Sequence, residues 1–277
     1  MKIKCPAKIN LTLEIVGKRD DGYHNIKSIM QLISLYDILD IKIEPGIDEI
    51  LLSGNSNEIP YNEKNLVYKA ADLFYKTTKI SGIRTQIYIE KHIPIAAGLA
   101  GGSTDAAGTV YGLNKLFHNP LSKEELHELC AQLGSDLNVC LEGGCILATS
   151  RGEKIQKLEP AFYPVTLIKP KNLGISAKEA YTKYAAKENK PKYNMTEKML
   201  EALENKEDIS NLLYNDLEYA VFDDYTELQT IKKQIPEAIM SGSGSTYFVL
   251  KDIEPDLANY QIIRGLKFIN HGICHCG

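Results

Sequence analysis

Residues 94–107 read PIAAGLAGGSTDAA, and this stretch decides the predicted fold. Its three glycines, at positions 98, 101 and 102, let the backbone turn sharply and approach a ligand closely. Residues 103–105 are Ser, Thr and Asp, which are typical of a helix N-cap and first turn, and apolar side chains then follow at helical spacing at Ala106, Val110, Leu113 and Phe117. A glycine-rich loop ending at a helix N-terminus presents free N–H groups and a positive dipole, so this segment predicts a phosphate site.

The segment does not match the sequence patterns of two common phosphate-binding loops. A P-loop requires a lysine after its last glycine, whereas Gly102 is followed by Ser103. A dinucleotide-binding turn follows the first strand of its fold, whereas this loop lies near residue 100 and follows a strand-like run at 85–90. A plain helix entry is the alternative, although the small residues at positions 96, 97, 98, 100 and 101 favour close approach to a ligand.

The composition is that of an ordinary globular protein. The 277 residues are 44% hydrophobic and 25% charged, which suits one large domain or two ordinary ones. With 32 basic and 36 acidic residues the net charge is −4, which gives no electrostatic case for binding nucleic acid. No apolar run approaches the roughly 20 residues that span a bilayer, and the N-terminus has no signal-peptide core. We expect a cytoplasmic protein, off the membrane, that is a monomer or a weak homodimer.

Six cysteines are spread along the chain. Those at 130, 140 and 145 fall in apolar surroundings, which predicts small buried side chains in a reducing compartment. A C-terminal group, His271, Cys274, His275 and Cys276, matches no standard zinc spacing and lies in a strand-like run, so we expect no metal there.

Hydrophobic periodicity and capping residues predict an α+β chain, because strands and helices interleave without strict alternation. Strands are expected over 2–16, 26–35, 38–44, 85–90, 143–158 with a turn at 151–152, 165–169, 238–250 with a Ser/Gly turn, and 268–275. Helices are expected after an Asn65 cap, from a Ser122–Glu125 capping box to Gly134, over 176–186, in several pieces up to about 234, and over 257–266.

Further segments complete an ordered set of motifs. The chain opens with CPAKINL at 5–11, followed by DGYH at 21–24, and reads SGSGS at 241–245. Together with GLAGGSTDAA at 98–107, these segments resemble the ordered motifs of the GHMP small-molecule kinases along nearly the whole chain. Each motif alone is weak to moderate evidence for this family, but the ordered set of motifs is specific to it.

The resemblance implies a two-domain GHMP-kinase fold. It consists of an N-terminal split β-α-β domain, a C-terminal ferredoxin-like α/β-plait domain, and an active site in the cleft between them. Pro160 and Pro164 mark a boundary, so we expect an ATP-binding domain over residues 1–158 and a second domain over 159–277. The resemblance also implies ATP as co-substrate, Mg²⁺, and transfer of a phosphoryl group to a small-molecule alcohol.

Two residues would carry the reaction if the resemblance holds. In this family a Lys of the PAKIN motif and an Asp of a Gly-[Ala/Ser]-Asp motif meet at the acceptor hydroxyl, and Lys8 and Asp136 match them. A nearby ammonium keeps such a carboxylate ionised and oriented. From the residues alone, Asp136 is also a plausible helix N-cap, and Lys8 a solvated residue on a strand edge.

The matched motifs also imply the ligand-binding residues. For ATP, Asn65 and Lys91 match positions near the base, and the phosphates would lie on Pro94, Ile95, Ala96, Ala97, Gly98, Leu99, Ala100, Gly101, Gly102, Ser103 and Thr104. The plain alternatives are that Asn65 only caps a helix and that Lys91 is a solvated charge. One member of the family uses a cytidine diphosphate acceptor, and its acceptor-binding positions match Asn10, Tyr23, His24, Tyr181, Ser241 and Gly242.

Two departures from the family pattern concern this machinery. The Val-Pro-Phe that usually follows the Asp is Leu-Asn-Val at 137–139, and the usual glycine run before the loop Leu is Ala-Ala-Gly at 96–98. Neither removes a group that does chemistry. The alternatives are another GHMP kinase, acting on a mevalonate-type, homoserine or sugar substrate, and a nucleotide-binding regulator without turnover.

Overall fold

The computed structural model describes residues 1–188 and 193–276. Its larger sheet has the strand order β12-β1-β2-β4-β3. In addition, β5 pairs with β2 and β6, and β8 pairs in parallel with β1. The strands of this sheet are β1 (Lys2–Lys18), β2 (His24–Pro45), β3 (Glu49–Gly54), β4 (Ile83–Glu90), β5 (Cys145–Ser150), β6 (Lys154–Lys157), β8 (Tyr214–Asn215) and β12 (Cys274–His275).

A smaller sheet is built from the second half of the chain. Its strand order is β11-β7-β10-β9, with β7 (Pro164–Pro170), β9 (Ile239–Met240), β10 (Tyr247–Val249) and β11 (Tyr260–Lys267). The helices are α1 (Leu66–Thr78), α2 (Gly101–Leu116), α3 (Lys123–Leu133), α4 (Leu137–Glu142), α5 (Ala177–Ala186), α6 (Met195–Asn205), α7 (Asp216–Val221), the 3-10 turn η1 (Phe222–Asp224) and α8 (Thr226–Gln234).

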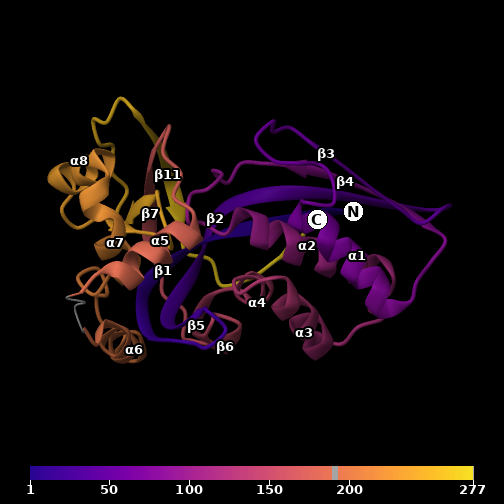
Figure 1. Ribbon diagram of the computed structural model, residues 1–277, viewed down its shortest axis with the longest axis horizontal. Helices are drawn as coiled ribbons and strands as arrows, with labels where there is room; N and C mark the ends of the chain where they lie inside the picture. The colour runs from indigo at the N-terminus through magenta and orange to yellow at the C-terminus, as the bar shows by residue number, and fades with distance from the viewer. Residues whose placement is uncertain (189–192, 277) are drawn as a thin grey trace.

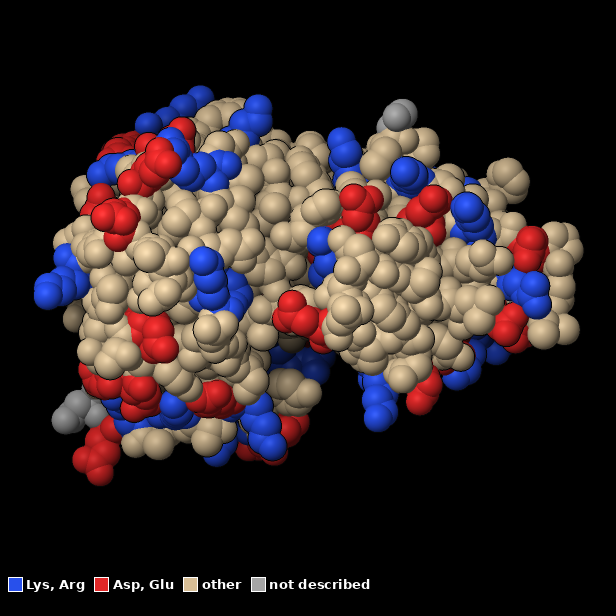
Figure 2. Space-filling model, turned by 90° about the horizontal axis from the view of Figure 1, so that it is seen from above, with Lys and Arg blue, Asp and Glu red and all other residues tan. Residues whose placement is uncertain are grey.

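The elements form two parts joined by the long strands β1 and β2 (Figure 1). Helices α1 to α3 gather at one end with both chain termini, while α5, α7 and α8 lie at the other end beside β7 and β11. Viewed from above, the molecule has two lobes with a hollow between them, and acidic and basic side chains are mixed on the visible face (Figure 2). This is the α+β, two-part arrangement that was predicted.

Strand β1 is covered on both faces. All its residues from Cys5 to Leu13 are buried, because helices α2 and α4 pack on one side and the second half of the chain on the other. One hydrophobic cluster lies between the larger sheet and helices α1 to α3 and includes Ile3, Phe74 and Val110. Another joins the two sheets and includes Ile9 and Phe248.

Several predicted local signals are confirmed. Asn65 caps α1 by accepting the Val67 N–H, and Ser122 with Glu125 forms the predicted capping box of α3. The predicted cysteines at 130, 140 and 145 are buried, and all six cysteines of the chain are free thiols. Within the described residues, no helix combines the length and apolar character required to cross a membrane.

The helix expected over 257–266 is wrong, because this segment forms β11. The strand pairs with β7, and its register shifts between Ile263 and Leu266, where Gly265 has a φ of 70°. A bulge inserts a residue and interrupts the alternation of a strand. The apolar side chains at 262, 263 and 266 therefore imitate helical spacing, and pairing in the sheet decides the structure.

Two strand limits also differ from the expected ones. The break expected at 36–37 is wrong, since β2 runs through it and buries Asp37 completely. The closing strand expected over 268–275 is shorter, with a single bridge from Phe268 to Ile33 followed by β12. The first error arose because a carboxylate inside a strand suggests a turn unless its buried partners are known.

Gly108 allows α2 to approach β1 closely, and its replacement tests this contact. A Cβ at this position would lie 2.3 Å from the Cys5 Sγ. We expect Gly108→Ala to lower the free energy of unfolding by about 1–3 kcal/mol, because overpacking outweighs the better helix propensity of alanine. Urea denaturation measures the change.

The matched control is Gly46→Ala, because a Cβ there meets only the Arg84 Cβ at an ordinary 3.6 Å. Removing the sulfur with Cys5→Ala should recover most of the loss caused by Gly108→Ala, so the two changes should not be additive. Full additivity would show that the close approach does not limit the packing of α2.

Candidate active site

The phosphate loop, which we define as residues 94–102, is fixed by hydrogen bonds to its carbonyls. The Leu99 carbonyl accepts the Lys8 backbone N–H at 3.1 Å, and the Gly98 carbonyl accepts both the Lys8 Nζ and the Ser241 Oγ at 3.0 Å. A Cβ on Gly98 would lie 2.0 Å from the Ser241 carbonyl oxygen. The loop from the first half of the chain therefore rests directly on the Ser/Gly loop of the second half.

The start of α2 differs from the expected N-cap at residues 103–105. The N-cap is Ala100, in a left-handed conformation with a φ of 60°, and it makes no side-chain cap hydrogen bond. Ala96 is also left-handed, with a φ of 50°. Alanine tolerates this conformation at a cost of roughly 1–2 kcal/mol, so the loop keeps a shape that glycine adopts freely. The first N–H groups of α2 have no partner within the helix and are available to an anion.

A buried ion triad lies beneath this loop. The Lys91 Nζ donates to Asp37 and, at 2.8 Å, to Asp105, and the three side chains are at most 8% exposed. The other carboxylate oxygen of Asp37 accepts the N–H groups of His92 and Ile93 at 2.6 and 2.8 Å. The triad thus joins β2, the end of β4 and the N-terminal part of α2. The alternative of Lys91 as a solvated charge is wrong.

The triad holds two carboxylates and one ammonium away from water. Burial raises the pKa of Asp105 to about 7; Lys91 opposes this effect and Asp37 adds to it. The two carboxylates raise the pKa of Lys91 in spite of its burial. One carboxylate oxygen of Asp105 has no hydrogen-bond partner among the described residues, which suits a protonated carboxyl.

Lys8 and Asp136 come together across the pocket floor. Lys8 is 3% exposed in the middle of β1, so the alternative of a solvated edge residue is wrong. Its Nζ lies 3.7 Å from the Asp136 Oδ2 and donates to the Asn10 Oδ1 at 2.7 Å. Asp136 occupies the N-cap position of α4 but makes no cap hydrogen bond, so its carboxylate is not used in capping.

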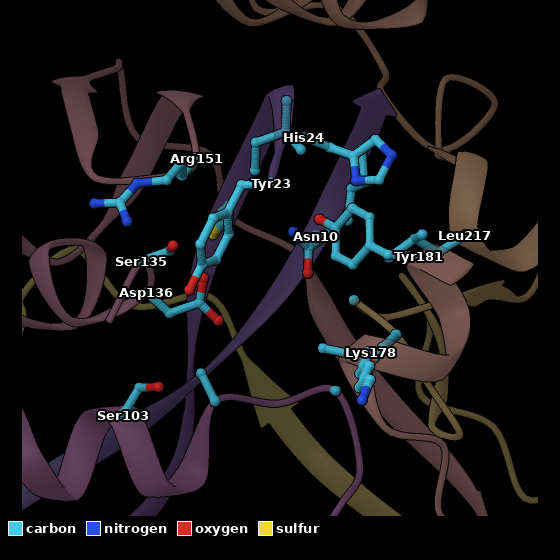
Figure 3. A pocket seen from close by; sticks show the side chains of 18 of the residues that line it. Asn10, Tyr23, His24, Ser103, Ser135, Asp136, Arg151, Lys178, Tyr181 and Leu217 are labelled. Atoms are coloured by element: carbon cyan, nitrogen blue, oxygen red, sulfur yellow. The ribbon is translucent and has the colours of Figure 1, made fainter. Parts of the chain in front are cut away.

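Aromatic side chains form the opposite end of the pocket. The rings of His24 and Tyr181 are stacked, with centroids 5.2 Å apart and planes at 18°. Tyr23 is 55% exposed, and the Arg151 guanidinium lies 5.3 Å from its ring centroid. Figure 3 shows the Tyr23 ring reaching into the pocket toward Asp136, with the His24–Tyr181 pair on the other wall.

These groups line one cavity of about 920 Å³ at the junction of the two parts. The predicted residues that line it are Lys8, Asn10, Tyr23, His24, Gly98, Ala100, Ser103, Asp136, Tyr181 and Gly242. The other predicted residues lie outside its lining: Asn65, Lys91, Pro94, Ile95, Ala96, Ala97, Leu99, Gly101, Gly102, Thr104 and Ser241. Thr104 is fully buried, and its hydroxyl has no partner within the described part of the chain.

Sequence reasoning missed several lining residues, including Lys18, Ser135, Arg151, Lys178 and Leu217. Arg151 was noticed only as part of a turn, and Lys178 stands in the segment that leads to Tyr181. Ser135 lies within the Gly-[Ala/Ser]-Asp motif, Lys18 pairs in register with His24, and Lys178 lies one turn before Tyr181, so these three could have been found.

The described residues offer few clustered side-chain ligands for Mg²⁺. Among residues 1–188 and 193–276 there is no group of three or more His, Cys, Asp or Glu side chains arranged to hold a metal ion. The pocket lining does offer the Ser103 hydroxyl near the start of α2, and the Asp136 carboxylate also lines it. Mg²⁺ commonly takes one or two protein oxygens and completes its shell with substrate phosphates and water. The residues present therefore fit this ion.

The comparisons with known proteins agree with this geometry. The family described as GHMP kinases N terminal domain matches residues 65–145. A 4-diphosphocytidyl-2-C-methyl-D-erythritol kinase of Carboxydothermus hydrogenoformans is 40% identical over 97% of this chain and 96% of its own length. The Clostridium botulinum protein of the same name is 43% identical over 90% of each chain.

Solved structures give the same result. A crystal structure of 4-(cytidine 5'-diphospho)-2C-methyl-D-erythritol kinase superposes with a TM-score of 0.78 and 29% identity, covering 98% of this chain and 100% of that one. A homoserine kinase from Cytophaga hutchinsonii shares the fold, with a TM-score of 0.77 at 18% identity, 98% of this chain and 95% of that chain being covered.

The fold and the phosphate loop define a small-molecule kinase of the GHMP class. Relatives of about 40% identity over almost the full length show which family within this class the chain belongs to. The chain belongs to the GHMP kinases and, among them, to the family of 4-diphosphocytidyl-2-C-methyl-D-erythritol kinases.

The buried triad predicts a pH dependence of stability. The pKa of Asp105 is about 7 in the folded protein and near the ordinary value of 3.8 in the unfolded chain. Asp105 therefore stabilises the fold below pH 4, and this contribution is lost as the pH rises toward 7. We expect Asp105→Asn to gain stability relative to wild type by on the order of 1–4 kcal/mol between pH 4 and 7.

Urea denaturation at several pH values measures this difference. Asp72→Asn is the matched control, because that carboxylate is 41% exposed and, among the described residues, forms an ion pair only with Lys76 one turn away. Parallel pH profiles for wild type and Asp105→Asn would contradict the assignment of a raised pKa to Asp105.

Proposed function

We propose that this protein transfers the γ-phosphoryl group of ATP to the 2-hydroxyl of 4-diphosphocytidyl-2-C-methyl-D-erythritol, giving the 2-phosphate and ADP in the non-mevalonate route to isoprenoid precursors. The observation that carries the proposal is the Lys8–Asp136 pair, which lies in one cavity between the phosphate loop and an aromatic end. The names of the relatives supply the substrate.

The reacting hydroxyl would lie at Asp136. Its carboxylate is 30% exposed within the pocket and is not used in capping, so it can accept the proton that the hydroxyl loses. The Lys8 ammonium lies beside this carboxylate, where negative charge would develop. Because the same ammonium binds the Gly98 carbonyl, the base and the phosphate loop keep a fixed relative position.

The phosphates of ATP would lie on the phosphate loop and the N-terminus of α2. Free N–H groups and the helix dipole favour anions there, and the buried triad holds the loop in place. Mg²⁺, when bound, neutralises charge on the transferred phosphoryl group. Ser103 is the side chain that would hold it together with the phosphates. We infer that residues 1–158 form the ATP-binding domain and 159–277 the second domain.

The cytosine ring would lie between Tyr23 and Tyr181. Tyr181 already stacks on His24 through one face, and Tyr23 carries Arg151 on one side, so each tyrosine has one face for the base. Aromatic stacking on a base contributes roughly 1–3 kcal/mol per face. Asn10, held by Lys8 and Ser28, would contact the acceptor near the reacting hydroxyl.

We place the reaction in the cytoplasm. All six cysteines are free thiols, which suits a reducing compartment. We also infer that the protein is a monomer or a weak homodimer.

Asp136→Asn tests the base. We expect kcat to fall by about 10²- to 10⁴-fold while the Kd for ATP changes little, because the amide cannot accept the proton. Steady-state ADP release and ATP calorimetry give the two values. Asp21→Asn is the control, because it removes a carboxylate from the same pocket at the hairpin end; its kcat should stay within threefold of wild type. If Asp136→Asn kept more than a third of wild-type kcat, the residue would not be the base.

A panel of alcohols tests the substrate. With Mg-ATP, kcat/KM for the cytidylated compound should exceed that for 2-C-methyl-D-erythritol, mevalonate and homoserine by more than 100-fold, because binding energy at the base positions the remote hydroxyl. Equal turnover of any of these would reject the acceptor and leave only the kinase class. Binding of ATP and the cytidylated compound without ADP release would instead indicate a nucleotide-binding regulator.

A further inference from the structure

The pocket carries more positive charge than its own acids neutralise. Among its described lining residues, Asp136 pairs with Lys8, and Asp21 pairs with Arg19. Arg151 lies 3.9 Å from Glu153 and covers the ring of Tyr23.

Two lining cations remain, Lys18 and Lys178. Neither has an ion pair or a side-chain hydrogen bond to any residue of the described chain. Two unpaired ammonium groups in one cavity favour an anionic ligand, beyond the aromatic base and the hydroxyl already considered.

The two lysines stand at different depths of the pocket. Lys18 ends β1 and pairs in register with His24, at the hairpin end. Lys178 is in the first turn of α5, three residues before Tyr181, and both side chains are on the helix face that lines the cavity. Figure 3 shows Lys178 between Tyr181 and the phosphate loop.

In the proposed binding mode of the acceptor, Lys178 lies beside the part of the acceptor that joins the base to the reacting hydroxyl. The base would lie at Tyr181 and the reacting hydroxyl at Asp136, so the part of the acceptor that joins them crosses the middle of the pocket. In the compound named for the relatives this joining part is a diphosphate. Lys178 is the unpaired cation beside that path, whereas Lys18 lies beyond His24.

We propose that Lys178 binds the diphosphate of the acceptor and is a specificity-determining residue for nucleoside diphosphate substrates. The inference rests on the proposed function and deepens it. Lys178 is exposed and its ammonium is not used in the fold, so it is free to pair with the ligand. A charge-assisted contact of this kind discriminates a diphosphate from an uncharged ligand by about 10- to 100-fold in Kd.

The rival role for Lys178 is a contact with the γ-phosphate of ATP, since the phosphate loop lies on its other side. The two roles differ in which ligand loses affinity when the charge is removed. Loss of the acceptor contact weakens CDP and leaves ATP unchanged, whereas loss of an ATP contact does the opposite.

The experiment compares the Kd values of cytidine, CDP and ATP by calorimetry for wild type and Lys178→Gln. Wild type should bind CDP at least tenfold more tightly than cytidine. Lys178→Gln should lose most of this preference, with the Kd for cytidine and for ATP within twofold of wild type. Lys178→Arg, which keeps the charge, should retain most of the preference for CDP over cytidine. Thermal unfolding verifies that each variant is folded.

Two control variants make the result specific. Lys183→Gln removes the same charge from the same helix, but Lys183 is paired with Glu179 and Asp224 and is not part of the pocket lining. It should leave the CDP preference unchanged. Lys18→Gln removes the other unpaired cation of the pocket and should have a clearly smaller effect than Lys178→Gln.

Three results would overturn the proposal. An unchanged CDP preference in Lys178→Gln would show that the lysine does not contact the diphosphate. An equal loss in Lys18→Gln would mean that only the general field of the pocket matters, and a selective loss of ATP affinity would assign Lys178 to ATP. If wild type bound neither cytidine nor CDP, the proposed acceptor itself would be wrong, a result that is distinguishable from the other three.

Discussion

The buried ammonium of Lys8 is the constraint on which the site depends. An unpaired charge inside a protein is very costly, so a lysine that is 3% exposed in the middle of a strand needs acceptors around it. Its partners are the Gly98 carbonyl, the Asn10 side chain and Asp136, which come from the phosphate loop, β1 and the start of α4. Satisfying one charge therefore brings together the phosphate loop, β1 and the start of α4.

A second buried cation supports the phosphate loop from below. Lys91 lies between Asp37 and Asp105, and Asp37 also accepts two backbone N–H groups at the end of β4. In addition to packing, this ion triad with its directed hydrogen bonds holds the N-terminal part of α2 to β2 and to the end of β4. The two lysines therefore hold opposite sides of the same loop. Both side chains are buried, so water does not take the place of their protein partners.

The same fold is found in a kinase that is named for a different acceptor. The homoserine kinase shares the architecture at only 18% identity, so the scaffold is compatible with more than one alcohol. Under the proposed function, the residues that would distinguish acceptors are those at the aromatic end, on the β1–β2 hairpin and on α5, where Tyr23, Tyr181 and Lys178 line the cavity. These positions lie on one hairpin and one helix face, which can change without disturbing the buried cations.

The sequence alone determined the phosphate loop, the capped helices, the α+β class and the family, because these depend on local glycine chemistry, capping and ordered motifs. Tertiary structure decided the rest. It made 260–267 a bulged strand, buried Asp37 inside β2 and placed Lys91 in an ion triad instead of in solvent. It also brought Arg151 and Lys178 to the pocket, although no motif includes them. The physical reason is that pairing in a sheet and compensation of buried charge depend on partners far along the chain, which local patterns do not specify.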